Sequence, residues 1–189
     1  MILLDHLSKK FEGKSVLNDV VLEIPEGKKI TIIGPSGSGK STILKLILGL
    51  IYPDSGKVLI DDVDISCLSL EALYKMRQKI GLLFQSSALF DSMTVAENVG
   101  FSLIEGSTHY TQSDIDYQVD HALELVEMDE FKYMYPAELS GGQQKRVGLA
   151  RAIIHKPAYI LYDEPTTGLD PILSTNIENL IVRISDELN

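Results

Sequence analysis

The stretch "GPSGSGKST", residues 34–42, decides how the rest of this sequence is interpreted. It fits the pattern G-x-x-x-x-G-K-[ST], in which Gly34, Gly39, Lys40 and Ser41 hold the defined positions. Glycines in such a loop let successive backbone N–H groups turn toward one centre and surround a phosphate. A helix that starts at the end of the loop adds about half a positive charge at the same place. The pattern therefore predicts a loop that binds nucleotide phosphate.

The flanking sequence gives this loop the context it needs. The apolar run "KKITII" before it predicts a strand at 29–33, and the run "ILKLILGLIY" after it predicts a helix from about 40 to 50. Alternatively, the glycine-rich stretch could merely connect a strand to a helix. The Lys-Ser pair at the positions that the pattern defines argues against this alternative. Lys40 is expected to reach the β- and γ-phosphates, and Ser41 to offer its hydroxyl to Mg²⁺. The predicted phosphate-binding residues are Gly34, Pro35, Ser36, Gly37, Ser38, Gly39, Lys40, Ser41 and Thr42.

Composition narrows the class of protein. The 189 residues are 44% apolar and 23% charged, which is ordinary for a globular domain. The formal net charge of −10 argues against a protein that mainly grips nucleic acid, because that role needs a basic face. The single cysteine, Cys67, excludes a disulfide within the chain, so we expect a reducing, cytosolic setting. The most apolar run, 43–52, is too short to span a bilayer, so any membrane connection should come through a partner.

The hydrophobic periodicity predicts an α/β core that is interrupted by a helical insert. Helices are expected at 69–77 and over most of 92–155, where Thr111 with Asp114 fits a capping signature. A last helix is expected after Asp170, which is placed to N-cap it, with Pro171 in its first position. Between turn signals, further short strands are expected at 2–7, 20–24, 57–60, 80–84 and 159–162.

Polar side chains follow two of the predicted buried strands. "YILYDEP" ends a strand in Asp163 and Glu164. Asp163 is expected to hold Mg²⁺ through its water, complementing Ser41, and Glu164 to polarise the attacking water as general base. Alternatively, the two acidic residues could simply lie where the strand leads into a loop, which is common. The phosphate loop upstream favours the catalytic interpretation. Gln85, after "IGLLF", could ligate Mg²⁺ or hold the water, or equally be a surface glutamine.

A second glycine pair stands in "ELSGGQQKR", residues 138–146, where a helix is expected to begin. Ser140 and Gln143 form a capping box, which accounts for an ordinary helix start. The box leaves Gly141 and Gly142 unexplained, since glycine costs about 1 kcal/mol relative to alanine inside a helix. A helix N-terminus stripped of side chains suits close approach by an anion.

Taken in order, these motifs strongly resemble those of an ABC-transporter ATPase subunit. The resemblance rests on "LSGGQ" (139–143), together with "GPSGSGKST", Gln85, "YILYDEP" and "GLDP" (168–171), and it covers essentially the whole chain. It implies an α/β P-loop NTPase fold with an N-terminal antiparallel β part. It also implies a single domain, 1–189, with a RecA-like core at about 1–88 and 156–189 and a helical subdomain at about 89–155.

The resemblance implies ATP and Mg²⁺ as cofactors, ATP hydrolysis, and a second subunit in a head-to-tail homodimer. Ser140, Gly141, Gly142 and Gln143 of one subunit would close on the γ-phosphate held by the other. Phe11 stands where the family has its adenine-stacking aromatic, although on its chemistry alone it could equally be a core residue. The resemblance further implies a dimer-seam role for Asp170, which its N-capping position also explains, and a relay to the membrane subunit at Gln85.

The chain departs from the family in one respect. The family has a switch histidine on a strand well after the catalytic glutamate, and only 25 residues follow Glu164 here (189 − 164). We expect a truncated chain or an unusually short subunit, in which nucleotide binding survives better than hydrolysis. A nucleotide-binding module without turnover is thus an alternative function. The histidines present are His6, His109, His121 and His155.

The segment 82–103 bears on the transporter class. Many ABC importers have a proline in the part occupied here by Asp91, and "ALFDSMTVAENV" looks more like the ATPase of phospholipid-trafficking systems that work with Mce-type lipid-binding proteins. The expected partners are therefore a transmembrane permease and a Mce-type protein, at the cytoplasmic face of a bacterial inner membrane, without nucleic acid. An ATPase of an amino-acid or other small-solute importer is the alternative. A soluble assembly ATPase also stays open.

Overall fold

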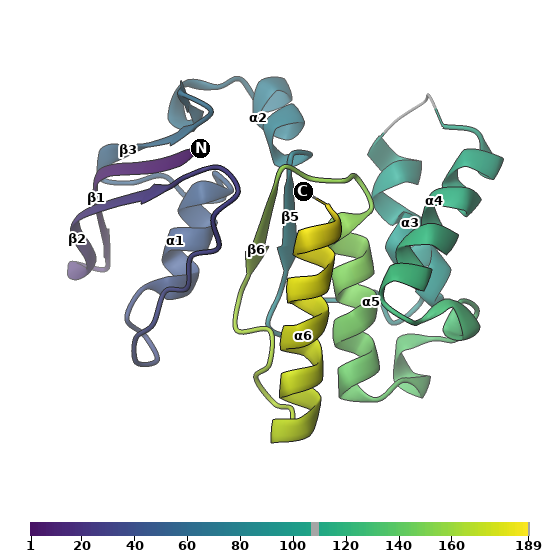
Figure 1. Cartoon of the computed structure of the whole chain (residues 1–189). Coiled ribbons are helices and arrows are strands. Elements are labelled where there is room, and N and C mark those ends of the chain that lie inside the picture. Colours follow the sequence, from purple (N-terminus) through teal and green to yellow (C-terminus); the bar gives the residue numbers. More distant parts are fainter. Residues whose placement is uncertain (107–109, 189) are drawn as a thin grey trace. The chain divides into compact units, whose positions relative to one another are not determined.

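The structure, a computed structural model, describes residues 1–106 and 110–188 (Figure 1). The chain forms two compact units, Met1–Arg77 and Gln78–Asn189, called here the N-terminal and the C-terminal unit.

The N-terminal unit combines an antiparallel sheet with two α-helices. Within the sheet, the first two strands form a hairpin whose turn residues, Glu12 and Gly13, have φ angles of 49° and 79°, as a tight hairpin turn requires. The strands, in the sheet order β2-β1-β3-β4, are β1 (Ile2–Phe11), β2 (Lys14–Ile24), β3 (Ser55–Ile60) and β4 (Val63–Asp64). The helices are α1 (Lys40–Ile47), the 3-10 turn η1 (Ile65–Cys67) and α2 (Leu70–Arg77).

The core of this unit lies between the sheet and α1. Ile2, Leu4 and Leu7 of β1 are buried, and so are Leu46 and Ile47 of α1. The backbone carbonyls that follow α1 receive hydrogen bonds from α2. Arg77 donates from Nε to the Leu48 carbonyl at 2.8 Å and from Nη2 to the Gly49 carbonyl at 2.9 Å. This bond pair ties α1, which carries the end of the phosphate loop, to its own unit.

The prediction of strands at 2–7, 20–24 and 57–60 is confirmed, although each strand is longer than predicted. The prediction of a strand at 29–33 is wrong, because residues 28–35 form no strand and the side chain of Ile33 is 90% exposed. An apolar run becomes a strand only when a neighbouring backbone pairs with it. The strands of the N-terminal unit pair only with one another, and none of them pairs with 29–33.

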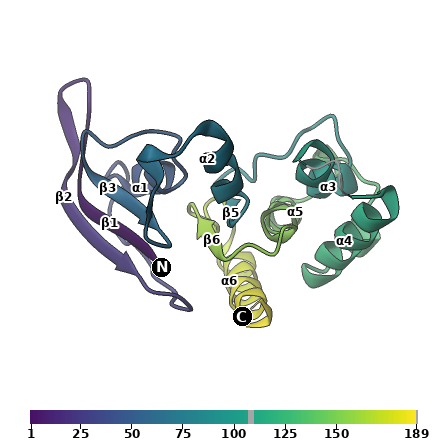
Figure 2. The ribbon, with the colours of Figure 1, turned by 90° about the horizontal axis from the view of Figure 1, so that it is seen from above.

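In the part of the chain that the structure describes, the C-terminal unit holds a two-stranded parallel sheet and four α-helices. Its strands run in register, from the pair Ile80–Tyr159 to the pair Leu83–Tyr162. The strands are β5 (Ile80–Leu83) and β6 (Tyr159–Tyr162). The helices are α3 (Val95–Gly106), α4 (Gln112–Leu125), α5 (Gly141–Ile153) and α6 (Pro171–Glu187), with 3-10 turns η2 (Asp129–Phe131) and η3 (Pro136–Glu138). Figure 2 shows β5 and β6 side by side, with α5 and α6 next to them.

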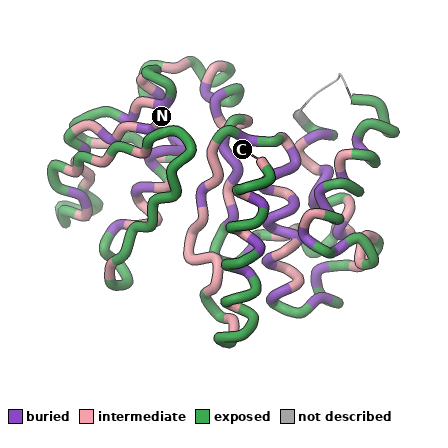
Figure 3. The backbone as a smooth tube through the Cα atoms, in the orientation of Figure 1, coloured by how far each residue is buried: buried purple, intermediate pink, exposed green. Residues whose placement is uncertain are grey.

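Helix α5 is the centre of this unit and contacts β5, α3, α4 and α6. Most residues from Val147 to Ile153 are buried, and in the backbone tube of Figure 3 this part of α5 is mostly purple. Since α5 is surrounded on several sides, it fixes the places of its neighbours. Among the described residues, no helix has the length and apolar character needed to cross a bilayer.

The predicted helix starts are confirmed at two places in this unit. Thr111 and Asp114 form a complete capping box at the start of α4. Asp170 N-caps α6, where its Oδ1 accepts hydrogen bonds from the N–H groups of Ile172 at 2.9 Å and Leu173 at 3.0 Å. Caps of this kind join residues two or three apart, which is why the sequence alone predicts them.

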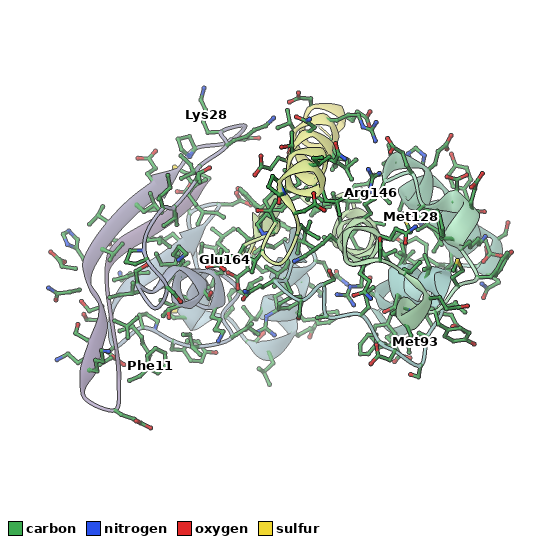
Figure 4. All side chains as sticks on the ribbon, turned by 90° about the horizontal axis from the view of Figure 1, so that it is seen from below. Phe11, Lys28, Met93, Met128, Arg146 and Glu164 are labelled. Carbon is green, nitrogen blue, oxygen red and sulfur yellow. The ribbon has the colours of Figure 1, made fainter. Side chains whose placement is uncertain are left out.

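Glu127, just after α4, accepts hydrogen bonds from two helices. Arg146 of α5, labelled in Figure 4, places its Nη1 2.7 Å from the Glu127 Oε2 atom. The Nη1 of Arg183, on α6, lies 2.9 Å from the Glu127 Oε1 atom. Hydrogen bonds from Arg146 and then Arg183 hold the pKa of the Glu127 carboxyl below its usual value. The carboxylate therefore stabilises the fold above its unfolded-state pKa, and this contribution is lost as pH falls through the lowered pKa.

Glu127→Gln is expected to lower the free energy of unfolding at pH 7 by about 1 kcal/mol. The expected loss is small because the contacts of Glu127 with Arg146 and Arg183 are partly exposed to solvent, which weakens ion pairs. The difference from the parent chain should shrink as the pH is lowered from 7 to about pH 3, because protonation of the carboxylate through its lowered pKa removes the charge that the arginines bind. Urea unfolding at both pH values measures this. Glu71→Gln, which removes an exposed pair with Lys75 on α2, is the control and should cost less than about 0.5 kcal/mol. A loss that does not change with pH would contradict the assignment.

Candidate nucleotide-binding and catalytic site

The phosphate loop belongs to the N-terminal unit and curls around the side chain of Lys40. Its Nζ donates hydrogen bonds to the Gly34 carbonyl at 2.9 Å and to the Pro35 carbonyl at 3.1 Å. These carbonyls hold the ammonium group against the start of the loop, although Lys40 itself lies at its end. A positive charge is thus present within the curve of the loop, where the phosphate pattern predicts it.

The glycines of the loop are required by its shape. Gly37 and Gly39 have φ angles of 78° and 100°, which side-chain-bearing residues rarely adopt. A Cβ at Gly39 would also stand 2.9 Å from Leu17 and 3.2 Å from Val16, because the loop passes close to β2. Gly39 is the N-cap of α1 and has no side chain with which to cap it. Backbone N–H groups are therefore the polar groups that this helix start offers to an anion.

Phe11, the predicted adenine-stacking residue, is the last residue of β1 and lies at the hairpin turn (Figure 4). Its ring is not a core side chain, since the residue is 44% exposed. Lys9 Nζ lies 5.6 Å from the ring centroid, within range of a cation–π contact. Exposure at a strand end is what a stacking platform needs. The stacking itself remains a prediction.

The predicted catalytic polar residues meet at one edge of the parallel sheet in the C-terminal unit. Asp163 directly follows β6, and its N–H donates to the Leu83 carbonyl at the end of β5, at 3.0 Å. Gln85 comes two residues after that carbonyl. Since carboxyl ends of parallel strands share one edge, Gln85, Asp163 and Glu164 stand on neighbouring segments. Gln85 is exposed, which fits a group that is presented to a ligand.

Glu164 has an unusual backbone conformation, with a φ of 45° (Figure 4). A non-glycine residue in this left-handed region is strained, and such residues gather at functional sites. Its Oε2 accepts a hydrogen bond from the Thr167 hydroxyl at 3.1 Å, which orients the carboxylate. The left-handed backbone and the hydrogen bond from Thr167 fix the position of the carboxylate, as the predicted role of general base requires.

The second glycine pair begins α5 in the C-terminal unit, as predicted. Ser140 Oγ accepts from the Gln143 N–H at 3.3 Å, and Gln143 Oε1 accepts from the Ser140 N–H at 2.8 Å, so the capping box is confirmed. A Cβ at Gly141 or Gly142 would meet nothing closer than 3.7 Å. Ordinary packing within the chain therefore leaves room for alanine at both positions. Close packing among the described residues thus does not account for glycine at these two positions.

The sequence reasoning missed four residues that position Gln85. Lys145 is 5% exposed, and its Nζ donates to the Gln85 carbonyl, while burial lowers the pKa of its amine. Arg151 donates to the carbonyls of the same turn, and Gly81 and Gly148 let the turn and β5 approach α5. One signal was available in the sequence, because Lys145 shares a helical face with the apolar Leu149 and Ile153, at i and i+4 spacing.

The histidines stand outside this site as far as the structure describes them. His6 lies on β1 and pairs with Asp19 at 2.7 Å, and this hydrogen bond raises the pKa of its ring. His155 follows α5, and burial lowers the pKa of its ring. His121 belongs to α4 and stacks at 6.5 Å from Tyr117. His109 lies outside the described residues.

Comparison with known proteins gives the family. The family model described as "ABC transporter" matches residues 17–167. The methionine import ATP-binding protein MetN of Carboxydothermus hydrogenoformans is 44% identical over 191 residues, which are 100% of this chain and 56% of that protein. The Arabidopsis thaliana chloroplastic protein TRIGALACTOSYLDIACYLGLYCEROL 3 is 45% identical over 197 residues, which are 95% of this chain and 54% of that protein. The chain spans about half the length of the curated relatives it matches.

A solved structure supports the same assignment. The dimeric ATP-binding cassette MJ0796, in a post-hydrolysis state bound to ADP and Pi, superposes with a TM-score of 0.88. It is 36% identical in sequence, and the match covers 99% of this chain and 84% of that one. The predicted α/β P-loop NTPase fold is thereby confirmed. With its phosphate loop, its carboxylates at the end of β6 and its glycine-started α5, the chain belongs to the ABC transporter family.

Proposed function

We propose that the chain binds and hydrolyses ATP and drives a transport step through a separate membrane subunit. The observation that carries this proposal is the phosphate loop, in which the Gly34 and Pro35 carbonyls hold the ammonium group of Lys40, the first residue of α1, within the curve of the loop. A loop of this shape leaves backbone N–H groups and a fixed positive charge for the phosphates of a nucleotide. The ADP and Pi named for the MJ0796 structure support the proposal from a relative.

Each predicted residue has a role in this proposal. Ser41 and Asp163 supply a hydroxyl and a carboxylate, the hard oxygen groups that suit Mg²⁺, so the residues present fit the ion. Bound Mg²⁺ would neutralise charge on the β- and γ-phosphates. Glu164 acts as general base toward the attacking water, and Gln85 holds that water or the ion. Phe11 stacks against the adenine.

The proposal includes a second copy of the chain, placed head to tail. Room for alanine at Gly141 and Gly142 supports it, because a bare helix N-terminus has no use within the described chain but would suit a γ-phosphate held by a partner. In this arrangement Ser140, Gly141, Gly142 and Gln143 act in trans, and Asp170 lies at the seam in addition to capping α6. The relative MJ0796 is a dimer by its printed description.

A lipid is the transported substrate that we propose, with a permease and a Mce-type lipid-binding protein as partners at the cytoplasmic face of a bacterial inner membrane. The sequence of 82–103 supports this choice, and one relative is named for a glycolipid, trigalactosyldiacylglycerol. A small-solute importer is the second candidate, favoured by the relative named for methionine import. Pull-down from detergent-solubilised membranes separates the two, because a Mce-type protein should be recovered with the chain only in the first case.

Lys40→Ala is expected to weaken ATP binding about 10- to 100-fold, because each charge-assisted hydrogen bond contributes about 1.5–3 kcal/mol. Titration with a fluorescent ATP analogue in the presence of Mg²⁺ measures the affinity. Lys45→Ala is the matched control, since this exposed lysine lies on the same helix and outside the loop. If the Lys40 variant binds ATP as tightly as the parent chain does, the nucleotide assignment fails.

A further inference from the structure

One face of α5 is committed to the turn that carries Gln85. Three side-chain hydrogen bonds run from the helix to the carbonyls of this turn. Lys145 donates to the Gln85 carbonyl, and Arg151 donates to the Ser87 carbonyl at 2.6 Å and to the Ala88 carbonyl at 2.8 Å. All three bonds join residues of the C-terminal unit that are at least 60 positions apart in the sequence.

Two glycines allow the contact between these segments. A Cβ at Gly148, between the two donors on the helix, would stand 2.8 Å from Leu83 and 3.2 Å from Ser87. A Cβ at Gly81 of β5 would stand 2.3 Å from the Ala152 carbonyl. At Gly81 the blocking atom is backbone and cannot move aside, whereas at Gly148 the Leu83 and Ser87 side chains would have to shift, so β5 and its turn pack closely against α5.

The held turn is strained as well as buried. Ser87 and Ala88 have φ angles of 59° and 47°, in the left-handed region that residues with a Cβ rarely adopt. Ser87 is 1% exposed, while Gln85 at the start of the turn is exposed. A strained backbone persists only when its surroundings hold it. The donors from α5 hold the carbonyls of these residues and leave the Gln85 side chain outward.

The N-terminal end of α5 lies one helical turn before Lys145. Gly142 precedes Lys145 by three residues, so the bare helix start and the Gln85 contact lie within a single turn of one buried helix. Because groups along one helix are joined by its backbone hydrogen bonds, a displacement of the α5 start as a rigid element would also displace the donors to the Gln85 turn.

We infer that Lys145 and Arg151 are positioning residues that lock the Gln85 turn onto α5, so that closure of the glycine-started helix on a nucleotide sets the position of Gln85. This inference rests on the proposed function, in which Gln85 acts on the water or the ion. It adds two residues to the catalytic machinery that touch no substrate.

The first test does not depend on activity. Amide hydrogen exchange of the peptide covering 84–88 is expected to rise at least tenfold in Lys145→Met and in Arg151→Met. Arg146→Met is the matched control, because Arg146 lies on the same helix but donates to the Val126 carbonyl and to Glu127 instead, and it should leave this peptide within twofold of the parent. Circular dichroism confirms folding, and if one test variant does not fold, the other decides. Unchanged exchange in a folded variant overturns the inference.

The second test is a double-mutant cycle on ATP turnover. Lys145→Met should lower kcat at least fivefold and leave KM for ATP within twofold. Gln85→Ala removes the side chain but keeps the carbonyl, so Lys145→Met added to it should change kcat less than twofold. The control Arg146→Met should change kcat by the same factor in the parent chain and in the Gln85→Ala variant. Equal losses from Lys145→Met with and without the Gln85 side chain overturn the inference. If the parent chain shows no turnover, the proposed function fails, and the exchange measurement alone decides on the contact.

Discussion

Glu164→Gln is expected to lower ATP turnover at least about 100-fold, since a positioned general base contributes about 10²–10⁴-fold to such a reaction. The glutamine has nearly the shape of the glutamate and keeps an oxygen that can accept from Thr167, as the carboxylate does at 3.1 Å. The strained backbone at this position should therefore persist. ATP affinity should stay within about threefold, because the phosphate loop is unchanged. Phosphate release and fluorescent-nucleotide titration measure the two quantities.

A second variant and the activity of the parent chain decide how the Glu164→Gln result is interpreted. Thr167→Val removes the hydroxyl that orients the carboxylate and should lower turnover by about tenfold or less, because the base itself remains. If the parent chain and Glu164→Gln are equally silent while both bind ATP, the alternative of a nucleotide-binding module without turnover is correct. A Glu164→Gln variant that hydrolyses ATP as fast as an active parent excludes Glu164 as the base.

Gly142→Asp is expected to abolish ATP-driven dimerisation and to leave ATP binding nearly intact. Gly142 is buried, but the first atom of the new side chain fits, because the nearest atom to a Cβ there is a Leu173 methyl carbon 3.7 Å away. It should not harm the helix, since an acidic residue in a first turn is favourable and aspartate costs less than glycine within a helix. The carboxylate would instead repel a γ-phosphate that approaches the helix start. We expect dimer affinity to fall by more than about 100-fold, which is about 3 kcal/mol.

Sedimentation with Mg²⁺ and ATP, in a Glu164→Gln background that keeps the nucleotide intact, measures this dimerisation. Asn176→Asp adds the same charge at an exposed position of α6 and should leave dimerisation unchanged. Gly142→Ala adds a methyl group without charge and should have an intermediate effect. Dimerisation of Gly142→Asp at the parent's affinity would show that α5 does not meet a partner's nucleotide.

The features that can be read directly from the order of residues are local ones. The capping boxes at Thr111 and Ser140 and the cap at Asp170 are present as predicted, because each joins groups two or three residues apart. The phosphate loop was recognisable for the same reason, since its glycines, lysine and serine act through one continuous turn of backbone. The strand at 159–162 has its predicted bounds, because a short apolar run between polar ends fixes both of them.

Interactions between residues far apart in the sequence could be found only in the folded chain. The run at 29–33 has the pattern of a strand and forms none, because no strand of its own unit pairs with it. The contact of Lys145 with the Gln85 carbonyl joins residues 60 positions apart, and the need for glycine at Gly81 and Gly148 arises only where β5 and its turn meet α5. Pairing and close packing depend on which backbone comes near, and the spacing of residues along a chain does not contain that information.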